Sequence, residues 1–171
     1  MSEVSTVVTM HGNELVLRGE AVNVGDRVAD VALTDNELSA VSLSSFLGKV
    51  CLISSVPSLD TPVCDVMTRR FNEEASELGD DVVVLTVSMD LPFAQSRWCG
   101  AAGIANVQTL SDYLEGAFGE AFGLMIEGLR LLARAVFVVD KEGVVRYKEL
   151  VGELTNEPDY DAAVAAAKEL L

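Results

Sequence analysis

Alternating and continuous runs of apolar residues divide the first half of the chain into strands and a helix. Residues 6–10 and 15–18 alternate in polarity across a glycine-containing turn and predict an N-terminal β-hairpin. Apolar runs at 50–56 and 82–88 predict two buried strands, and the stretch 62–78 between them, closed by a glycine, predicts a helix. Two strands joined through a helix imply parallel pairing with a right-handed crossover.

The second half of the chain continues the mixture of helices and strands. The predicted elements are a helix that begins near Pro92, a short strand at 107–110, a glycine-interrupted helix at 113–122, a strand pair at 133–139 and 144–149, and an amphipathic helix at 158–171. A βαβ half followed by a β-hairpin and a terminal helix predicts an α/β protein with the thioredoxin-like arrangement, in which a mixed central sheet carries helices on both faces. No repeat or linker interrupts the pattern, so we expect residues 1–171 to form a single domain.

Composition narrows the class of protein without indicating a reaction. Half of the 171 residues are hydrophobic, which is enough for a sizeable core. Twelve basic residues against 27 acidic ones give a net charge of −15, which opposes binding to nucleic acid or to an anionic membrane. No apolar run is long enough to cross a bilayer, and the N-terminus lacks the basic and apolar regions of a signal peptide, so we expect a cytoplasmic protein.

The three cysteines, Cys51, Cys64 and Cys99, do not form the pattern of a secreted disulfide framework. Their number is small and odd, and no two of them form a CxxC pair. In a reducing compartment, a disulfide among them would be transient and catalytic. The single histidine, His11, lies in the predicted hairpin turn, so neither a Cys-His protease site nor a zinc site of cysteines and histidine is favoured.

Cys64 lies where a predicted buried strand meets a predicted helix. Pro57 ends the strand, Thr61 is a helix N-cap followed by proline, and Cys64 is about the third helical residue. We therefore expect its sulfur near the unpaired N–H groups and the positive end of the helix, with Arg69 and Arg70 in the next two turns. Such surroundings favour the thiolate, which is the nucleophilic form of cysteine. By position alone, the packing of a small apolar cysteine is an equally good interpretation.

The residues around Cys64 resemble a known active site. The spacing PxxxTxxC, formed by Pro57, Thr61 and Cys64, is the active-site pattern of the peroxiredoxins, and SVPSLDTPVCDVMTRRFNEEA resembles the thiol peroxidase branch of that family. The resemblance implies that Cys64 is the peroxidatic cysteine, whose thiolate takes the distal oxygen of a peroxide and becomes a sulfenic acid. The Thr61 hydroxyl can donate to the sulfur or to a peroxide oxygen as well as cap the helix. Pro57 would stiffen the loop, although without the motif it is only a strand terminator.

A fixed cation beside the thiolate is also needed, and arginine suits this role because it stays charged. Spacing alone cannot choose among the arginines of the chain, which include Arg69, Arg70, Arg97, Arg130 and Arg134. The segment ARAVFVVD resembles the family segment in which an arginine at the start of a late strand approaches the peroxidatic cysteine. This resemblance implies Arg134, and most of the others are expected to be surface charges.

The segment DLPFAQSRWCGAAGI, residues 90–104, resembles the resolving-cysteine segment of the atypical two-cysteine thiol peroxidases. The resemblance implies that Cys99 is the resolving cysteine and forms an intramolecular disulfide with Cys64. A disulfide needs α-carbons about 4.4–6.8 Å apart, so we expect local movement there. Without the resemblance, packing beside Trp98 is the better interpretation of Cys99. Cys51 is expected to be an inert residue of a buried strand.

The resemblance implies a thioredoxin-dependent peroxidase that acts on hydrogen peroxide and on organic (alkyl) hydroperoxides. It also implies a homodimer with no metal, haem or flavin cofactor. Two alternatives remain open from the residues. One is a thioredoxin-fold disulfide exchanger, which the missing CxxC pair makes less favoured. The other is a redox-sensing or chaperone-like binding protein that uses oxidation of Cys64 as a switch.

Overall fold

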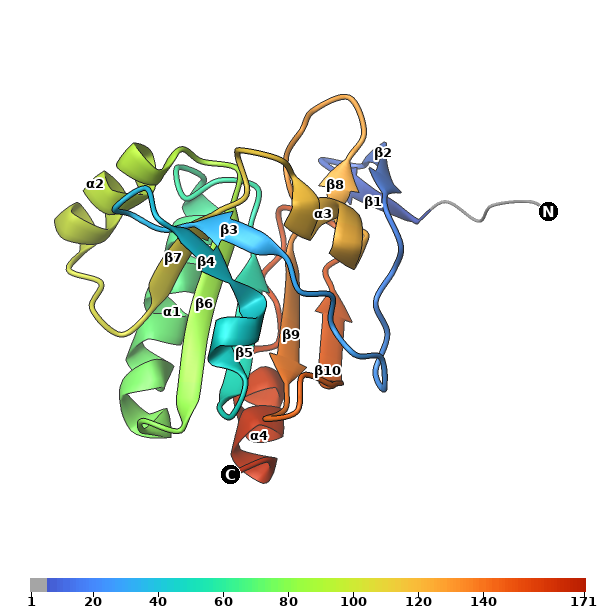
Figure 1. The fold of residues 1–171 in the computed structure, drawn as a ribbon. Helices are drawn as coiled ribbons and strands as arrows, with labels where there is room; N and C mark the ends of the chain where they lie inside the picture. The colour runs from blue at the N-terminus through green and yellow to red at the C-terminus, as the bar shows by residue number, and fades with distance from the viewer. Residues whose placement is uncertain (1–5) are drawn as a thin grey trace.

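The structure is a computed structural model that describes residues 6–171 (Figure 1). Its elements, in chain order, are β1 (Val7–Met10), β2 (Asn13–Arg18), β3 (Ala32–Thr34), β4 (Ala40–Ser42), the 3₁₀ helix η1 (Leu43–Phe46), β5 (Val50–Ser55), α1 (Pro62–Leu78), β6 (Val82–Ser88), α2 (Pro92–Ala102), β7 (Gln108–Ser111), α3 (Ala117–Phe122), β8 (Met125–Ile126), β9 (Ala135–Val139), β10 (Val145–Leu150) and α4 (Tyr160–Glu169). Residues 1–5, which the single-domain prediction includes, lie outside the described residues. None of the helices within residues 6–171 is long and apolar enough to cross a membrane.

A seven-stranded mixed sheet forms the centre of the protein, in the order β10-β9-β5-β6-β7-β3-β4. The three middle strands β5, β6 and β7 are parallel, and β9 pairs with β5 in the antiparallel direction. The predicted parallel βαβ unit and the β9–β10 hairpin are therefore confirmed. The N-terminal hairpin β1–β2 is also confirmed, and with β8 it forms a second, three-stranded sheet.

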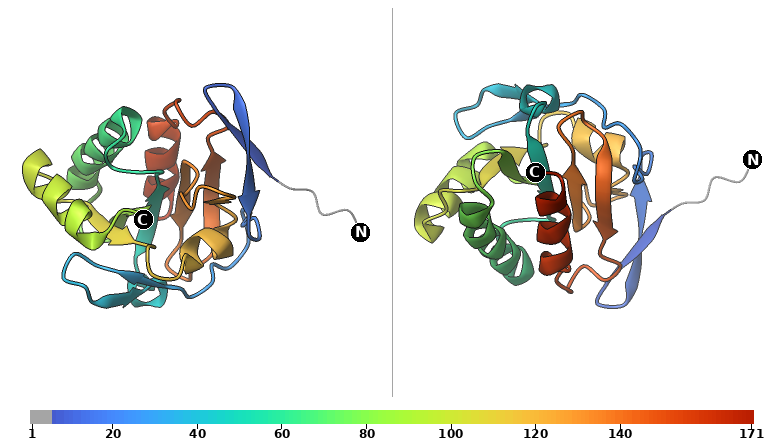
Figure 2. Two further views of the ribbon diagram at one scale, coloured as in Figure 1. Left: turned by 90° about the horizontal axis from the view of Figure 1, so that it is seen from above. Right: turned by 90° about the horizontal axis from the view of Figure 1, so that it is seen from below.

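Helices cover both faces of the large sheet, because the buried strands are apolar on both sides (Figure 2). Along β5, Leu52 belongs to the apolar cluster that contains residues of α1 and α4. Its neighbours Cys51 and Ile53 belong to the other cluster, together with residues of α3 and η1. This alternation follows from the two-residue period of a strand. It places α1 and Cys51 on opposite faces of the sheet.

The helix α1 has the predicted bounds because its end signals are local. Thr61 is extended and caps the first turn, Pro62 is the first helical residue, and Gly79 follows the last residue with φ of 83°. The predicted helix from Pro92 is also confirmed, and Cys99 lies in the last part of α2 rather than in the following loop.

Several other predictions need correction. The predicted helix 113–122 is only Ala117–Phe122, because Gly116 before it has a left-handed conformation that ends the preceding turn. The terminal helix starts at Tyr160 instead of at residue 158, since Asp159 is its N-cap. The predicted strand 107–110 is shifted by one residue, and the strand predicted from 133 begins at Ala135. The short strands β3, β4 and β8 were not predicted, because two or three residues carry no periodic signal.

Candidate active site

Cys64 is the third residue of α1 and points toward the sheet. Its side chain is 0% exposed and belongs to the apolar cluster under α1 and α4. The backbone N–H of Cys64 donates to the Thr61 hydroxyl oxygen at 3.3 Å. The Cys64 sulfur accepts a hydrogen bond from Nη1 of Arg134 at 3.0 Å. The thiol therefore lies at the positive end of a helix and against a guanidinium group.

The loop that leads into α1 is shaped by the carboxylate of Asp90, which lies two residues after the end of β6. One oxygen accepts from the Ser58 hydroxyl at 2.7 Å, and the other accepts from the Leu59 N–H at 2.8 Å and from the Ser88 hydroxyl at 2.7 Å. Asp90 was not predicted to contribute to the site. Its position after a buried strand is a usable signal, because the carboxyl ends of parallel strands meet at one edge of the sheet.

Thr61 caps α1 as predicted, but its hydroxyl hydrogen is already used. Oγ1 of Thr61 donates to the carbonyl of Ser58 at 3.0 Å while it accepts from the Cys64 N–H. The hydroxyl thus does not donate to the Cys64 sulfur in this arrangement. Pro57 is buried in the same loop, two residues after the end of β5.

Arg134 is held rigidly although it carries a charge in the interior. It is 2% exposed, and its Nε and Nη2 both donate to the carbonyl of Leu154, at 3.0 and 2.8 Å. The remaining nitrogen, Nη1, points at Cys64 and also lies 3.7 Å from the sulfur of Met67. A buried charge needs such partners. The Leu154 contribution has no sequence signal, since any residue supplies a carbonyl.

The two arginines nearest to Cys64 in sequence do not take this place. Arg69 pairs with Asp65 at 3.0 Å and Arg70 pairs with Glu74 at 3.1 Å, and both arginine side chains are partly exposed.

The N-terminal hairpin fixes the loop that carries Leu154. The Leu154 N–H donates to the Thr9 carbonyl at 2.8 Å, and the Thr9 N–H donates to the Gly152 carbonyl at 2.7 Å. The carboxylate of Glu153 accepts from the Thr155 N–H at 2.9 Å, from the Gly12 N–H at 2.9 Å and from the Thr9 hydroxyl at 3.1 Å. These donors, first the N–H groups of Thr155 and Gly12, lower the pKa of Glu153 from 4.5 to about 2.

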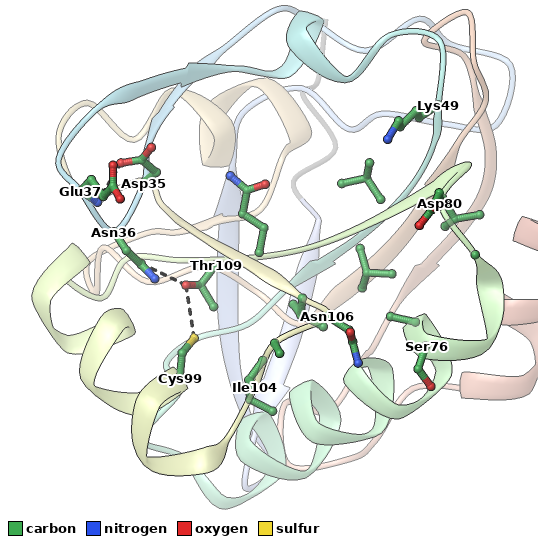
Figure 3. Close-up of a pocket in the computed structure, with 18 residues that line it drawn as sticks. Asp35, Asn36, Glu37, Lys49, Ser76, Asp80, Cys99, Ile104, Asn106 and Thr109 are labelled. Atoms are coloured by element: carbon green, nitrogen blue, oxygen red, sulfur yellow. Dashed lines mark hydrogen bonds between the residues drawn. The ribbon is translucent and has the colours of Figure 1, made fainter.

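Cys99 lies on α2 and faces β7, which is closer to the opposite edge of the sheet than β9 is. Its sulfur is 3.5 Å from Oγ1 of Thr109, and that hydroxyl donates to Asn36 at 3.1 Å (Figure 3). These residues line a groove of about 740 Å³. Burial raises the pKa of the Cys99 thiol, and the hydrogen bond with Thr109 opposes this increase. Burial therefore favours the protonated form of the Cys99 thiol over the thiolate.

The structure does not bring Cys99 into contact with Cys64. Arg134, which contacts Cys64, directly precedes β9, whereas Thr109, which contacts Cys99, lies on β7. The sheet order β9-β5-β6-β7 separates these strands by three spacings, or roughly 14 Å. Cys51 lies on the opposite face of the sheet, where burial raises its pKa to about 11.

The chemistry of this arrangement is that of an activated thiol. One cysteine has a cation and a helix N-terminus beside it, and the other two are held as thiols. Over residues 6–171, we find no group of three histidine, cysteine or acidic side chains placed to hold a metal ion.

Comparison with known proteins agrees with this chemistry. The family model described as Redoxin matches residues 23–164. The chain is 54% identical over 164 residues to a protein named thiol peroxidase from Bacillus subtilis (strain 168), covering 96% of this chain and 98% of that protein. It is 52% identical over 165 residues to a thiol peroxidase from Staphylococcus aureus (strain MRSA252), covering 96% of this chain and 99% of that protein.

Solved structures similar to this chain include a peroxiredoxin-like protein and a thiol peroxidase. The peroxiredoxin-like protein from Aquifex aeolicus has a TM-score of 0.91 and 40% identity, over 99% of this chain and all of that one. The thiol peroxidase from Chromobacterium violaceum has a TM-score of 0.84 at 22% identity, over 95% of each chain, which supports the fold.

Proposed function

The chain belongs to the Redoxin family and is a peroxidase of the thiol peroxidase type, and from this premise we propose that Cys64 reduces peroxides in a two-cysteine cycle with Cys99. The observation that carries the proposal is the 3.0 Å contact between Arg134 Nη1 and the buried sulfur of Cys64 at the start of α1. A cation at this place stabilises the thiolate and the negative charge that develops on oxygen during attack.

In the first step, the Cys64 thiolate attacks the distal oxygen of a peroxide. The S–O bond forms as the O–O bond breaks, and the leaving oxygen takes a proton and departs as water or an alcohol. The sulfur is oxidised to a sulfenic acid and the peroxide is reduced. Because the Cys64 side chain is 0% exposed, the groups that cover it have to move before a peroxide reaches the sulfur.

In the second step, the sulfur of Cys99 attacks the Cys64 sulfenic acid. An S–S bond forms, the S–O bond breaks, and hydroxide leaves with the thiol proton as water. A dithiol reductant then returns both cysteines to thiols through a mixed disulfide and becomes oxidised itself. We propose thioredoxin as this reductant, and hydrogen peroxide and alkyl hydroperoxides as substrates. The family resemblance of the two cysteine segments supports these assignments.

The proposed roles of the remaining site residues follow from their contacts. Thr61 caps α1 and fixes the Cys64 backbone, and Arg134 stabilises the thiolate. Pro57 shapes the buried start of the loop. We treat residues 1–171 as one catalytic domain in the cytoplasm, where dithiol reductants keep thiols reduced. The Redoxin match over residues 23–164 supports the domain assignment.

We also propose a homodimer. Three large apolar side chains, Leu91, Phe93 and Leu114, are 52%, 68% and 67% exposed. Leu91 and Phe93 lie at the start of α2 and Leu114 lies in the turn after β7, and these two segments are adjacent because the Ser111 hydroxyl donates to the Asp90 carbonyl. Such a surface is suited to a second copy of the chain. Light scattering of the wild type should give a molar mass twice that of the monomer. The Phe93→Glu variant should give a lower molar mass, because a charge at this position opposes association.

A turnover assay with hydrogen peroxide and reduced thioredoxin tests the peroxidase cycle. The wild type and a Cys51→Ala control should turn over many equivalents of peroxide, whereas Cys64→Ser should show none because a hydroxyl does not supply a thiolate. Cys99→Ser should complete the first oxidation but lose thioredoxin-supported turnover. Disulfide exchange without peroxide consumption would instead identify an exchanger. One stoichiometric oxidation without turnover would identify a redox sensor.

A further inference from the structure

Two residues that flank the cysteines connect the helices on which the cysteines lie. The indole Nε1 of Trp98, on α2, donates to Oδ1 of Asp65, on α1, at 3.0 Å. Oδ2 of the same carboxylate accepts from Nε of Arg69 at 3.0 Å, and Nη1 of Arg69 donates to the carbonyl of Ala102 at 3.3 Å. The guanidinium carbon of Arg69 lies 5.7 Å from the centre of the Trp98 ring. We call this set of contacts among Asp65, Arg69, Trp98 and Ala102 the interhelix bridge.

The position of the bridge relates it to both sulfur atoms. Asp65 directly follows Cys64, and Trp98 directly precedes Cys99. While the bridge is intact, the end of α2 stays on α1 and Cys99 stays against Thr109 on β7. Cys64 faces Arg134 beside β9, three strands away. A disulfide requires the two sulfurs to approach to about 2.05 Å, so it cannot form in this arrangement.

The helix α2 is anchored at its beginning and weakly held at its end. Of its residues, all of which the structure describes, only Pro92 and Gln95 are buried. The Gln95 side chain donates to Oγ of Ser88 at 3.0 Å and to the Leu110 carbonyl at 2.9 Å. After Gln95, the polar attachments of α2 are the interhelix bridge and the contact of Cys99 with Thr109. A segment with few buried groups opens at low cost, so the end of α2 can unwind while its first turn stays in place.

We propose that Asp65, Arg69 and Trp98 are positioning residues for disulfide formation, because the interhelix bridge holds Cys99 away from Cys64 and has to open before the sulfenic acid is resolved. The inference rests on the proposed function, since it takes Cys64 as the peroxidatic and Cys99 as the resolving cysteine. The inference adds the contacts that determine how fast Cys99 reaches the Cys64 sulfenic acid.

The bridge then also controls damage by excess peroxide. Until Cys99 arrives, a second peroxide can transfer an oxygen to the Cys64 sulfenic acid, giving sulfinic acid and water or an alcohol. Opening competes with this reaction, so a weaker bridge should give more disulfide and less sulfinic acid. Opening also removes the burial that raises the pKa of Cys99, which makes that thiol a better nucleophile.

The test compares Trp98→Phe and Asp65→Asn with the wild type. Trp98→Phe keeps an aromatic ring at this position and leaves the charges of Asp65 and Arg69 unchanged, but it deletes the N–H donor. Glu74→Gln is the matched control, because Glu74 pairs with Arg70 at 3.1 Å on the same helix and has no contact with α2 among its hydrogen bonds. Each protein is mixed with one equivalent of hydrogen peroxide and quenched with acid at intervals. Mass spectrometry then counts sulfenic acid, disulfide and, with excess peroxide, sulfinic acid.

We expect Trp98→Phe and Asp65→Asn to form the Cys64–Cys99 disulfide roughly fivefold faster and to accumulate less sulfinic acid, as expected for the loss of one partly exposed charge-assisted hydrogen bond. Trp98→Phe should leave the first oxidation unchanged, and Glu74→Gln should leave both steps unchanged. Trp98 is the only tryptophan of the chain, so its fluorescence reports directly on the bridge. Oxidation of the wild type should shift its emission to longer wavelength, and reduced Asp65→Asn should already show part of this shift.

Disulfide formation at the wild-type rate in both variants, or slower than in the wild type, would overturn the bridge proposal while the peroxidase cycle stands. Absence of any Cys64 sulfenic acid or peroxide consumption in the wild type would instead overturn the proposed function. Circular dichroism identifies a variant that has lost its fold, and the other variant then decides.

Discussion

Replacement of Arg134 by methionine tests the electrostatic basis of the site. Methionine is also long and unbranched, but it has no charge and no N–H donor. The change deletes the hydrogen bond of 3.0 Å from Nη1 to the Cys64 sulfur and both donors to the Leu154 carbonyl. We therefore expect a slower reaction of Cys64 with peroxide in a protein that still folds.

The magnitude follows from the burial of both partners. Arg134 is 2% exposed and Cys64 is 0% exposed, so solvent does not screen their contact. A hydrogen bond to a charged group contributes about 1.5–3 kcal/mol, and about 1.4 kcal/mol corresponds to a factor of ten in rate. The second-order rate constant for oxidation of Cys64 should therefore fall by roughly 10- to 150-fold. The unpaired carbonyl should also lower the free energy of unfolding by about 1–3 kcal/mol.

The assay is single-turnover oxidation by hydrogen peroxide at pH 7, together with iodoacetamide alkylation of Cys64 at the same pH. Alkylation should also be slower in the variant, because the sulfur has lost the cation beside it. Arg146→Met is the control, since Arg146 is half exposed and pairs with Asp140 at 2.8 Å in the β9–β10 hairpin. The same rate constants for oxidation and for alkylation in Arg134→Met and wild type would refute the reasoning.

Three further predictions test the cap, the unused cysteine and the loop that carries Leu154. Thr61→Val should lower the free energy of unfolding by about 1 kcal/mol, measured by denaturant unfolding, because the helix loses its N-cap. It should also slow oxidation of Cys64, because the cap holds the Cys64 backbone in place. An unchanged oxidation rate would show that Thr61 contributes to stability alone. Stoichiometric peroxide should give one intramolecular Cys64–Cys99 disulfide and leave Cys51 free, because Cys51 lies on the opposite face of the sheet; peptide mapping that finds Cys51 in the bridge contradicts this. The pKa of Glu153 is lowered from 4.5 to about 2, so its contribution to stability is complete above about pH 4.5 and is lost as the pH falls toward 2. The difference in Tm between wild type and Glu153→Gln should disappear over that range, and a difference that is independent of pH would exclude this linkage.

Signals that act within a few residues are readable from the chain. The bounds of α1 depend on Thr61, Pro62 and Gly79, each of which acts on the backbone next to it. The strands β5 and β6 are long enough to show continuous apolar runs. Local sequence therefore determined the strand–helix–strand unit and the place of Cys64 on it.

The shortest strands could not be recognised from the sequence, because the strands with which they pair define them. The strands β3 and β4 have three residues each and are defined by their pairing with each other and, through one residue pair, with β7. β3 and β4 form a short hairpin, and only the pair Thr34–Ser111 joins segments remote in sequence. Three residues are too few for a periodic pattern to mark a strand.

The chain by itself determined a thiol at a helix N-terminus, and the family motif indicated its chemistry. Only the tertiary structure decided which groups surround that thiol. Arg134 is 70 residues away from Cys64, and its orientation depends on the Leu154 carbonyl, which the N-terminal hairpin holds through Thr9. The hydrogen of the Thr61 hydroxyl goes to Ser58 because the loop folds back at that point. Charge and hydrogen bonding act over a few ångströms in space, so residues far apart in sequence determine the site once the sheet has assembled.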